Sequence, residues 1–205
     1  MPVLFEGDSN MIVFPNVYSQ STIERRFESI TDLQFAGIDA ELLWDEQRLI
    51  ACVVSKTVID DDRRQVIASI EMEKTEWMNE EALAVERYWE QEPNQIRGVV
   101  VLPKFQEFGL ATAMYETLVL DKKMVIVSDN EQYAGGKALW KHIAKKSKKL
   151  AVHVYDANTD SFYPFEAEGD LKYTGTNIVD DIIWSVDPDD SKFPVVLVAS
   201  EAQHQ

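Results

Sequence analysis

Residues 99–112, VVVLPKFQEFGLAT, place one glycine where an apolar run gives way to a helical pattern. The first N–H groups of a helix have no acceptor inside it and lie at the positive end of the helix dipole, so they can bind an anion. Gly109 would allow a phosphate to approach the backbone, Ala111 is small, and Thr112 adds a hydroxyl group. These residues indicate phosphate binding by backbone N–H groups. The alternative is a purely structural joint, because one glycine often connects a strand to a helix.

Other cofactor-binding signatures are absent from the sequence. There is no G-x-x-x-x-G-K-[ST], so the P-loop nucleotide-binding class has no support. No G-x-G-x-x-G follows a predicted strand, which argues against a dinucleotide-binding Rossmann domain. His142 and His204 have no metal-ligand spacing with each other or with Cys52, and we predict no metal site. His153 lies in a strand pattern, where a single histidine is usually structural.

The glycine turn belongs to a region in which strand and helix patterns alternate. Strand-like runs at 96–103, 123–129 and 150–158 are separated by helical patterns at 108–121 and 133–149. Leu110, Met114 and Leu118 give the first of these helices an apolar stripe. Two successive β-α-β crossovers predict neighbouring, roughly parallel strands with helices packed on the faces of the sheet.

The regions before and after this alternation have different patterns of apolar residues. Residues 40–59 hold two β-like runs around the polar turn at 45–48, and residues 63–74 alternate as a third strand, which predicts an antiparallel meander. An amphipathic helix is expected earlier, within 21–37, and a helical insertion around 76–93. Two β-like runs at 177–186 and 193–200 predict a closing C-terminal β-hairpin around 170–200, on the sheet edge. The predicted fold is mixed α/β in a single domain, 1–205.

The glycine turn resembles the acyl-CoA-binding segment of the GNAT superfamily of N-acetyltransferases. In that family an apolar strand, V-x-P, an aromatic residue and Q/R-x-x-G-x-G/A lead into a helix. The matching residues here are Val101, Pro103, Phe105, Gln106, Gly109 and Ala111. The order of elements from about residue 20 to 160 is also similar to the family, and residues 125–156 look most like GNAT-like proteins of tailed bacteriophages.

The resemblance implies a GNAT-like mixed sheet and transfer of an acetyl group from acetyl-CoA to a primary amine. Backbone N–H groups would hold the CoA pyrophosphate; they belong to Gln106, Glu107, Phe108, Gly109, Leu110, Ala111 and Thr112. The strand ending at Val101 and Leu102 would diverge from the strand at 123–129, so that its backbone pairs with the pantetheine arm and polarises the thioester carbonyl. The amine would attack directly, without a covalent enzyme intermediate.

Such a reaction needs a proton acceptor for the amine. Glu71 and Glu73 are two residues apart on a predicted strand and share one face, which is either turned to the cleft or simply exposed to solvent. Asp129 follows a predicted strand, where it would act in the site or cap the next helix. The family often protonates the departing thiolate with a tyrosine, but the aligned residue is Trp140. Tyr133 and Tyr155 are the substitutes, or packing residues.

Composition narrows the expected partners and compartment. The net charge of −16 disfavours nucleic acid and anionic membranes and favours a basic protein as partner, although the acidic clusters also fit a solvated surface. The lysines within 137–149 would either stabilise the C-terminus of a helix or bind a phosphate, which would be the 3′-phosphate of CoA or a phosphate of nucleic acid. No apolar run approaches the roughly 20 residues that span a bilayer, and no signal-peptide pattern is visible. With one cysteine, we expect a cytoplasmic protein, in the host cytoplasm if phage-encoded.

Three functions therefore compete at the level of sequence. The leading one is an acetyl-CoA-dependent N-acyltransferase. The second is a catalytically degenerate GNAT-fold phage protein that binds a host or virion partner, because Trp140 replaces the expected tyrosine and the protein is strongly acidic. The third, an acidic mimic of nucleic acid, rests on charge alone.

Overall fold

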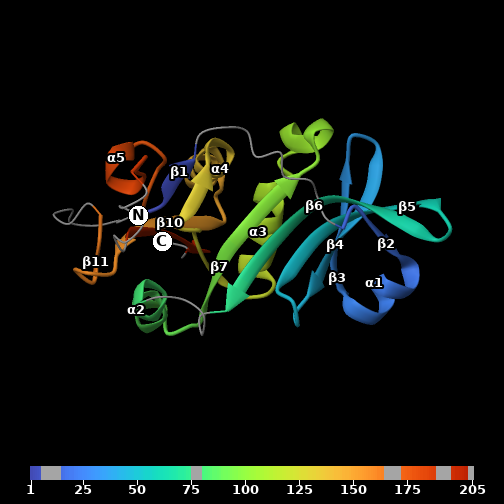
Figure 1. Ribbon diagram of the computed structural model, residues 1–205, viewed down its shortest axis with the longest axis horizontal. Helices are drawn as coiled ribbons and strands as arrows, with labels where there is room; N and C mark the ends of the chain where they lie inside the picture. Colours follow the sequence, from blue (N-terminus) through green and yellow to red (C-terminus); the bar gives the residue numbers. More distant parts are fainter. Residues whose placement is uncertain (6–14, 75–79, 164–171, 188–194, 203–205) are drawn as a thin grey trace. The chain divides into compact units, whose positions relative to one another are not determined.

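The computed structural model describes residues 1–5, 15–74, 80–163, 172–187 and 195–202 (Figure 1). These residues form an α/β protein with a large mixed β-sheet, which confirms the predicted fold class at that level. The chain divides into two compact units. Unit 1 holds residues 1–9, 74–96 and 118–205, and unit 2 holds residues 10–73 and 97–117. The prediction of a single domain stays a prediction.

Unit 2 is built on an antiparallel meander of β3 (Glu28–Phe35), β4 (Ile38–Asp45), β5 (Ile50–Asp60) and β6 (Arg63–Lys74), shown in blue to green in Figure 1. A short strand, β2 (Val17–Ser19), pairs antiparallel with β6. Side chains from alternate strand positions face a core that includes Ile23, Leu43, Cys52, Val54 and Val66. The meander predicted for residues 40–74 is confirmed.

The helix predicted within residues 21–37 is shorter than expected. Helix α1 (Gln20–Arg26) begins after Ser19, whose Oγ accepts the N–H of Thr22 at 3.2 Å. The following residues form β3, because Ala36 and Gly37 have φ values of 48° and 73° and make the two-residue turn that pairs β3 with β4. The helical spacing of apolar residues runs on into β3, but strand pairing outweighs this local preference.

A strand, a turn and a helix carry the chain onward in the predicted order. Strand β7 (Pro93–Val101) begins in unit 1 and ends in unit 2. A 3₁₀ helix, η2 (Pro103–Phe108), and helix α3 (Leu110–Leu120) follow it. The predicted apolar stripe of α3 is buried, which explains why this segment folds as a helix on a core.

The sheet of unit 1 runs in the order β7, β8 (Val125–Val127), β12 (Val195–Glu201), β10 (Leu150–Asp156) and β11 (Ser161–Phe162). Strands β7 and β8 are parallel, as predicted. However, β12 lies between β8 and β10 and is antiparallel to both. The prediction that β8 and β10 are neighbours is therefore wrong. All but the last residue of β12 is buried, and a strand buried throughout belongs in the interior of a sheet.

The C-terminal hairpin predicted around residues 170–200 is also wrong for the residues that the structure describes. Asp180–Ile183 form the short helix α5, and β12 pairs with β8 and β10. Asp180 opens α5, where a carboxylate is favourable. It also forms ion pairs of 2.8 and 2.7 Å with Lys137 and Lys141 of α4 (Ala134–Lys146). These charges stabilise the start of a helix rather than a strand.

Two further elements complete unit 1. Helix α2 (Glu80–Trp89) lies within the predicted insertion at 76–93, of which residues 76–79 are outside the described residues. Its Val85 and Trp89 pack on a core with Tyr155 and Phe162. Strand β1 (Val3–Phe5) pairs in parallel with β9 (Glu131–Tyr133), a contact between distant segments that the sequence did not predict. No helix of the described segments is long and apolar enough to cross a membrane.

Candidate functional site

The turn between β7 and α3 is tightly wound. Pro103 opens the 3₁₀ helix η2, where its fixed φ and missing N–H are tolerated. Gly109 ends it with φ 69° and ψ 17°, the left-handed region that favours glycine. A Cβ placed on Gly109 would meet no atom within 4 Å. The glycine is therefore required by the backbone conformation, and the space beside it is open.

The structure narrows the set of N–H groups that can face an anion. Each N–H of a 3₁₀ helix donates to the carbonyl three residues earlier, so those of Gln106, Glu107 and Phe108, and that of the C-cap residue Gly109, point back into η2. In α3 the N–H of Ala113 donates to the Gly109 carbonyl at 3.0 Å. The three N–H groups before it, at Leu110, Ala111 and Thr112, have no acceptor within the helix. The first turn of α3 also contains no acidic residue. The predicted seven-residue cradle is thus reduced to 110–112.

The end of β7 differs from the prediction for Val101 and Leu102. The Leu102 N–H donates to the Ile67 carbonyl of β6 at 2.9 Å, so it is not available to a ligand. Because the peptide group is planar and trans, the Val101 carbonyl points away from β6, and it accepts a hydrogen bond from Gln106 Nε2 at 3.3 Å. The N–H of Val101 points to the same side as its carbonyl. Val101, rather than Leu102, presents its backbone away from the meander.

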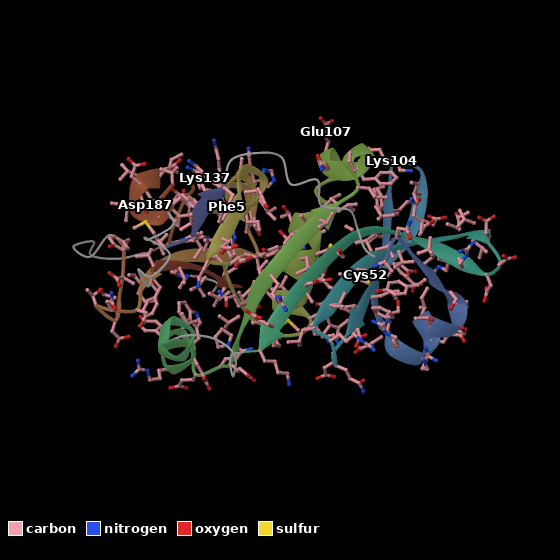
Figure 2. The ribbon with its side chains drawn as sticks, in the orientation of Figure 1. Phe5, Cys52, Lys104, Glu107, Lys137 and Asp187 are labelled. Carbon is pink, nitrogen blue, oxygen red and sulfur yellow. The ribbon has the colours of Figure 1, made fainter. Side chains whose placement is uncertain are left out.

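Aromatic rings surround the turn within unit 2. The Phe35 ring, at the end of β3, lies 5.6 Å from Phe105 and 6.1 Å from Phe108, centroid to centroid. Phe105 is buried, whereas Phe108 is about half exposed. The ammonium of Lys104 lies 4.7 Å from the Phe105 centroid, and Figure 2 shows Lys104 and Glu107 on the outside of η2. These rings anchor the turn to the β3–β4 hairpin and leave one aromatic face beside the start of α3.

Glu71 and Glu73 lie on β6 and share the face opposite the buried Met72, as their spacing predicted. The Arg97 Nε lies 3.6 Å from a carboxylate oxygen of Glu73. Glu71 is exposed and forms no ion pair among the described residues. Of this pair, Glu71 is the carboxylate that keeps its oxygens available.

The other two predicted residues lie in unit 1. Asp129 follows β8 and does not cap α4; its Oδ1 accepts the N–H of Glu131 at 3.2 Å, which makes a local turn before β9. Tyr133 ends β9 and is the N-cap residue of α4, without a side-chain capping bond. Its ring is exposed beside Phe5, at 6.2 Å between centroids. The prediction that Asp129 caps a helix is therefore wrong, because β9 intervenes.

Trp140 and Tyr155 are both interior residues of unit 1. Trp140 is only 2% exposed in α4, so its indole serves the core. The Tyr155 hydroxyl donates to the Asp160 carboxylate. Burial, and then this hydrogen-bonded carboxylate, raise the pKa of Tyr155 above its ordinary value. Tyr155 is therefore a packing residue with a satisfied hydroxyl, and Tyr133 is the better exposed phenol of the two.

Cys52 is buried among the strands of unit 2 (Figure 2). Burial raises the pKa of its thiol to about 12, which agrees with the predicted structural role. Within the described ranges, no group of three or more His, Cys, Asp and Glu side chains could hold a metal ion.

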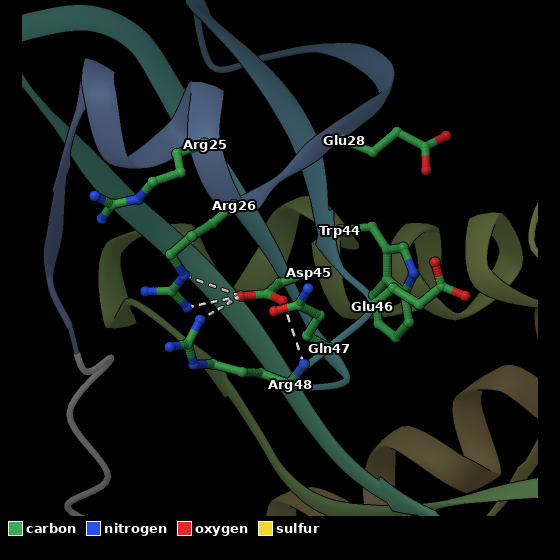
Figure 3. Close-up of a pocket in the computed structure, with 8 residues that line it drawn as sticks. All are labelled: Arg25, Arg26, Glu28, Trp44, Asp45, Glu46, Gln47 and Arg48. Atoms are coloured by element: carbon green, nitrogen blue, oxygen red, sulfur yellow. Dashed lines mark hydrogen bonds and ion pairs between the residues drawn. The ribbon is translucent and has the colours of Figure 1, made fainter.

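One pocket was missed by the sequence reasoning, which interpreted residues 45–48 only as a turn. It has a volume of 620 Å³ and lies at the β4–β5 turn, around Asp45 (Figure 3). The available signal was an aspartate directly after a buried apolar run, followed by an arginine three residues later. A buried charge needs a partner of opposite charge, and α1 supplies one in Arg26.

Comparison of the chain with protein-family models, with curated proteins and with solved structures gives no match.

Proposed function

We propose that the protein is a GNAT-type N-acyltransferase that moves an acetyl group from acetyl-CoA to a primary amine. The observation that carries the proposal is the conformation of residues 101–112. A strand end, a 3₁₀ turn, a left-handed glycine and an uncapped helix N-terminus occur there in the order of the acyl-CoA-binding motif. The open space beside Gly109 and the absence of acidic residues from the first turn of α3 fit an incoming pyrophosphate.

The chain's own groups would have distinct parts in binding. The N–H groups of Leu110, Ala111 and Thr112 would hold the pyrophosphate, and the Thr112 hydroxyl would add one donor. The backbone of Val101 would pair with the pantetheine arm, because it points away from β6. Acetyl-CoA supplies an activated thioester, so binding and orientation of the two substrates account for most of the rate enhancement.

The transfer requires two proton movements. The amine nitrogen bonds to the acetyl carbonyl carbon, the C–S bond breaks, the amine loses a proton, and the departing thiolate gains one. Glu71 is the proposed proton acceptor, directly or through water, since Glu73 pairs with Arg97 and Asp129 is engaged in its turn. Water would protonate the departing thiolate. Replacement of Glu71 by Gln should lower kcat at least about 100-fold, whereas Glu73→Gln should not.

The binding step can be tested with a charge placed at the start of α3. Ala111→Glu favours the helix dipole but sets a carboxylate against the pyrophosphate. We expect it to weaken binding of CoA, measured by isothermal titration calorimetry, by at least about tenfold. Thr117→Glu adds the same charge near the other end of the helix and is the matched control. Equal CoA binding by both folded variants would contradict the proposed site.

A second function is favoured by the burial of Trp140. An indole offers only an N–H, so no phenol stands at the position where the family often has its acid. On this reading the chain is a catalytically degenerate GNAT-fold phage protein that acts by binding a host or virion partner. Thiol release measured with a panel of primary amines separates the two. Binding of CoA without thiol release from any amine would favour the second function.

A further inference from the structure

The pocket at the β4–β5 turn is organised by a buried carboxylate. Asp45 is the last residue of β4, and its side chain is 2% exposed. Its Oδ2 accepts hydrogen bonds from Arg26 Nε at 3.0 Å and Nη2 at 2.8 Å, and from Arg48 Nη1 at 3.2 Å. Its Oδ1 accepts the backbone N–H of Arg48 at 3.2 Å. The carboxylate is therefore fully engaged and acts as a fixed anchor for two guanidinium groups.

The number of arginines exceeds what the carboxylate needs. One guanidinium would neutralise Asp45, yet Arg26 and Arg48 both bind it, and Arg25 lines the same pocket. Arg25 is exposed and forms no hydrogen bond or ion pair within the part of the chain that the structure describes. Three of the seven arginines of a chain with net charge −16 thus gather around one cavity. The bonds to Asp45 hold two of them in place.

The guanidinium groups have N–H donors that Asp45 does not use. A guanidinium carries five N–H donors, and Asp45 takes two from Arg26 and one from Arg48. Figure 3 shows all three guanidinium groups on one side of Asp45, and the Glu28 and Glu46 carboxylates on the other. The arginine side therefore has an excess of positive charge and of N–H donors, a combination that matches carboxylate and phosphate oxygens.

The cavity itself has the dimensions of a small-molecule site. Its volume of 620 Å³ lies within the range of ligand pockets, about 300–1,000 Å³. Trp44, which is almost completely buried, contributes to the lining and limits how far the walls can move. α1 supplies Arg25 and Arg26, the end of β4 supplies Asp45, and the β4–β5 turn supplies Arg48, so separate segments of unit 2 converge on the pocket.

We propose that this pocket is a binding site for the oxyanion, a carboxylate or phosphate group, of a small molecule, held by the free N–H groups of Arg25, Arg26 and Arg48. This assignment does not rest on the proposed acyltransferase function. Arg26 is the most firmly held of the three arginines. Asp45 binds its guanidinium group, which lies 5.4 Å from the ring centroid of Tyr18 and 5.0 Å from that of Phe27. Arg25 and Arg48, which are more exposed, provide the adjustable contacts.

The experiment is isothermal titration of the full chain with sodium phosphate and, separately, with sodium succinate, at constant ionic strength. Arg25→Gln and Arg48→Gln are the test variants, because both residues are exposed and neither removes the buried pair of Arg26 with Asp45. Arg63→Gln, an exposed arginine of the same unit outside the pocket, is the matched control. Thermal unfolding of each variant establishes that it is folded.

We expect saturable binding of at least one anion, weakened about tenfold or more by Arg25→Gln and by Arg48→Gln but not by Arg63→Gln. Phosphate binding alone identifies a phosphate group, and succinate binding alone a carboxylate. Absence of binding up to about 20 mM, or equal losses in the control variant, would overturn the proposal. So would phosphate binding that Ala111→Glu abolishes and Arg25→Gln leaves intact, since the anion would then lie at the start of α3.

Discussion

The ion pairs of Asp45 with Arg26 and Arg48 predict very different losses of stability for two similar substitutions. Arg26 is 21% exposed and gives Asp45 two hydrogen bonds, whereas Arg48 is 54% exposed and gives one from its side chain. Removal of one partner from a buried pair destabilises a protein by about 3–5 kcal/mol. The retained Arg48 offsets part of this loss, so we expect Arg26→Gln to lower the free energy of unfolding by about 2–3 kcal/mol.

Arg48→Gln should lower the free energy of unfolding by less than about 1 kcal/mol, because the charge of an exposed arginine is screened by solvent. The assay is urea unfolding of both variants and the wild type at pH 7. Equal losses for the two variants, or a loss below about 0.5 kcal/mol for Arg26→Gln, would refute the view that Arg26 compensates the buried carboxylate.

The ion pair of Asp45 with Arg26 also predicts how the stability of the protein changes with pH. Burial alone would raise the pKa of Asp45, but the hydrogen bonds from Arg26 and Arg48 outweigh it and hold the pKa below its ordinary value. A carboxyl whose pKa is lowered by folding stabilises the protein above its unfolded pKa of about 4, and this contribution is lost as the pH falls through the folded pKa. The difference between wild type and Arg26→Gln should therefore shrink below about pH 4. A difference that grows in acid would contradict this.

Two further predictions concern backbone strain and burial. Gly109→Ala should lower the free energy of unfolding by roughly 1 kcal/mol, from its φ of 69° alone. Gly175→Ala should lower it by about 2–4 kcal/mol, because Gly175 has a φ of 85° and an added Cβ would lie 2.9 Å from the Lys141 carbonyl oxygen. Equal losses for the two variants in urea unfolding would be inconsistent with these contacts. Cys52, whose thiol has a pKa raised to about 12 by burial, should not react with a thiol reagent at about pH 8 in the native protein, and should react fully in urea. Rapid labelling of the native protein would contradict the burial of Cys52.

Much of the fold follows from local sequence pattern. The alternation of residues 63–74 and the stripe of α3 each bury a defined set of side chains, so their periodicity predicts their structure. The polar residues 46–48 are exposed, as expected for a turn. The position of β12 does not follow in this way. It pairs with residues about 70 and 45 positions earlier, and hydrogen bonding between distant strands leaves no local signal beyond a continuous apolar run.

In the candidate site, too, the sequence predicts some features and not others. The sequence singles out Gly109 as a residue whose backbone a phosphate could approach, and the structure adds that its left-handed conformation favours glycine. The narrowing of the N–H donors to residues 110–112 could not be predicted, since it depends on how residues 103–108 wind. The arginine pocket was missed for another reason. Arg25 and Arg26 come from a helix and Arg48 from a turn, and only the folded chain brings them to Asp45.

The most direct test of the proposed acetyl-CoA site is the response of individual backbone amides to CoA. In ¹⁵N-labelled protein, titration with CoA should shift the amide resonances of Leu110, Ala111 and Thr112 most strongly, because their N–H groups would donate to the pyrophosphate. The amides of the β4–β5 turn should move much less. Saturable CoA binding that leaves residues 110–112 unshifted, or no binding at about millimolar CoA, would contradict the account.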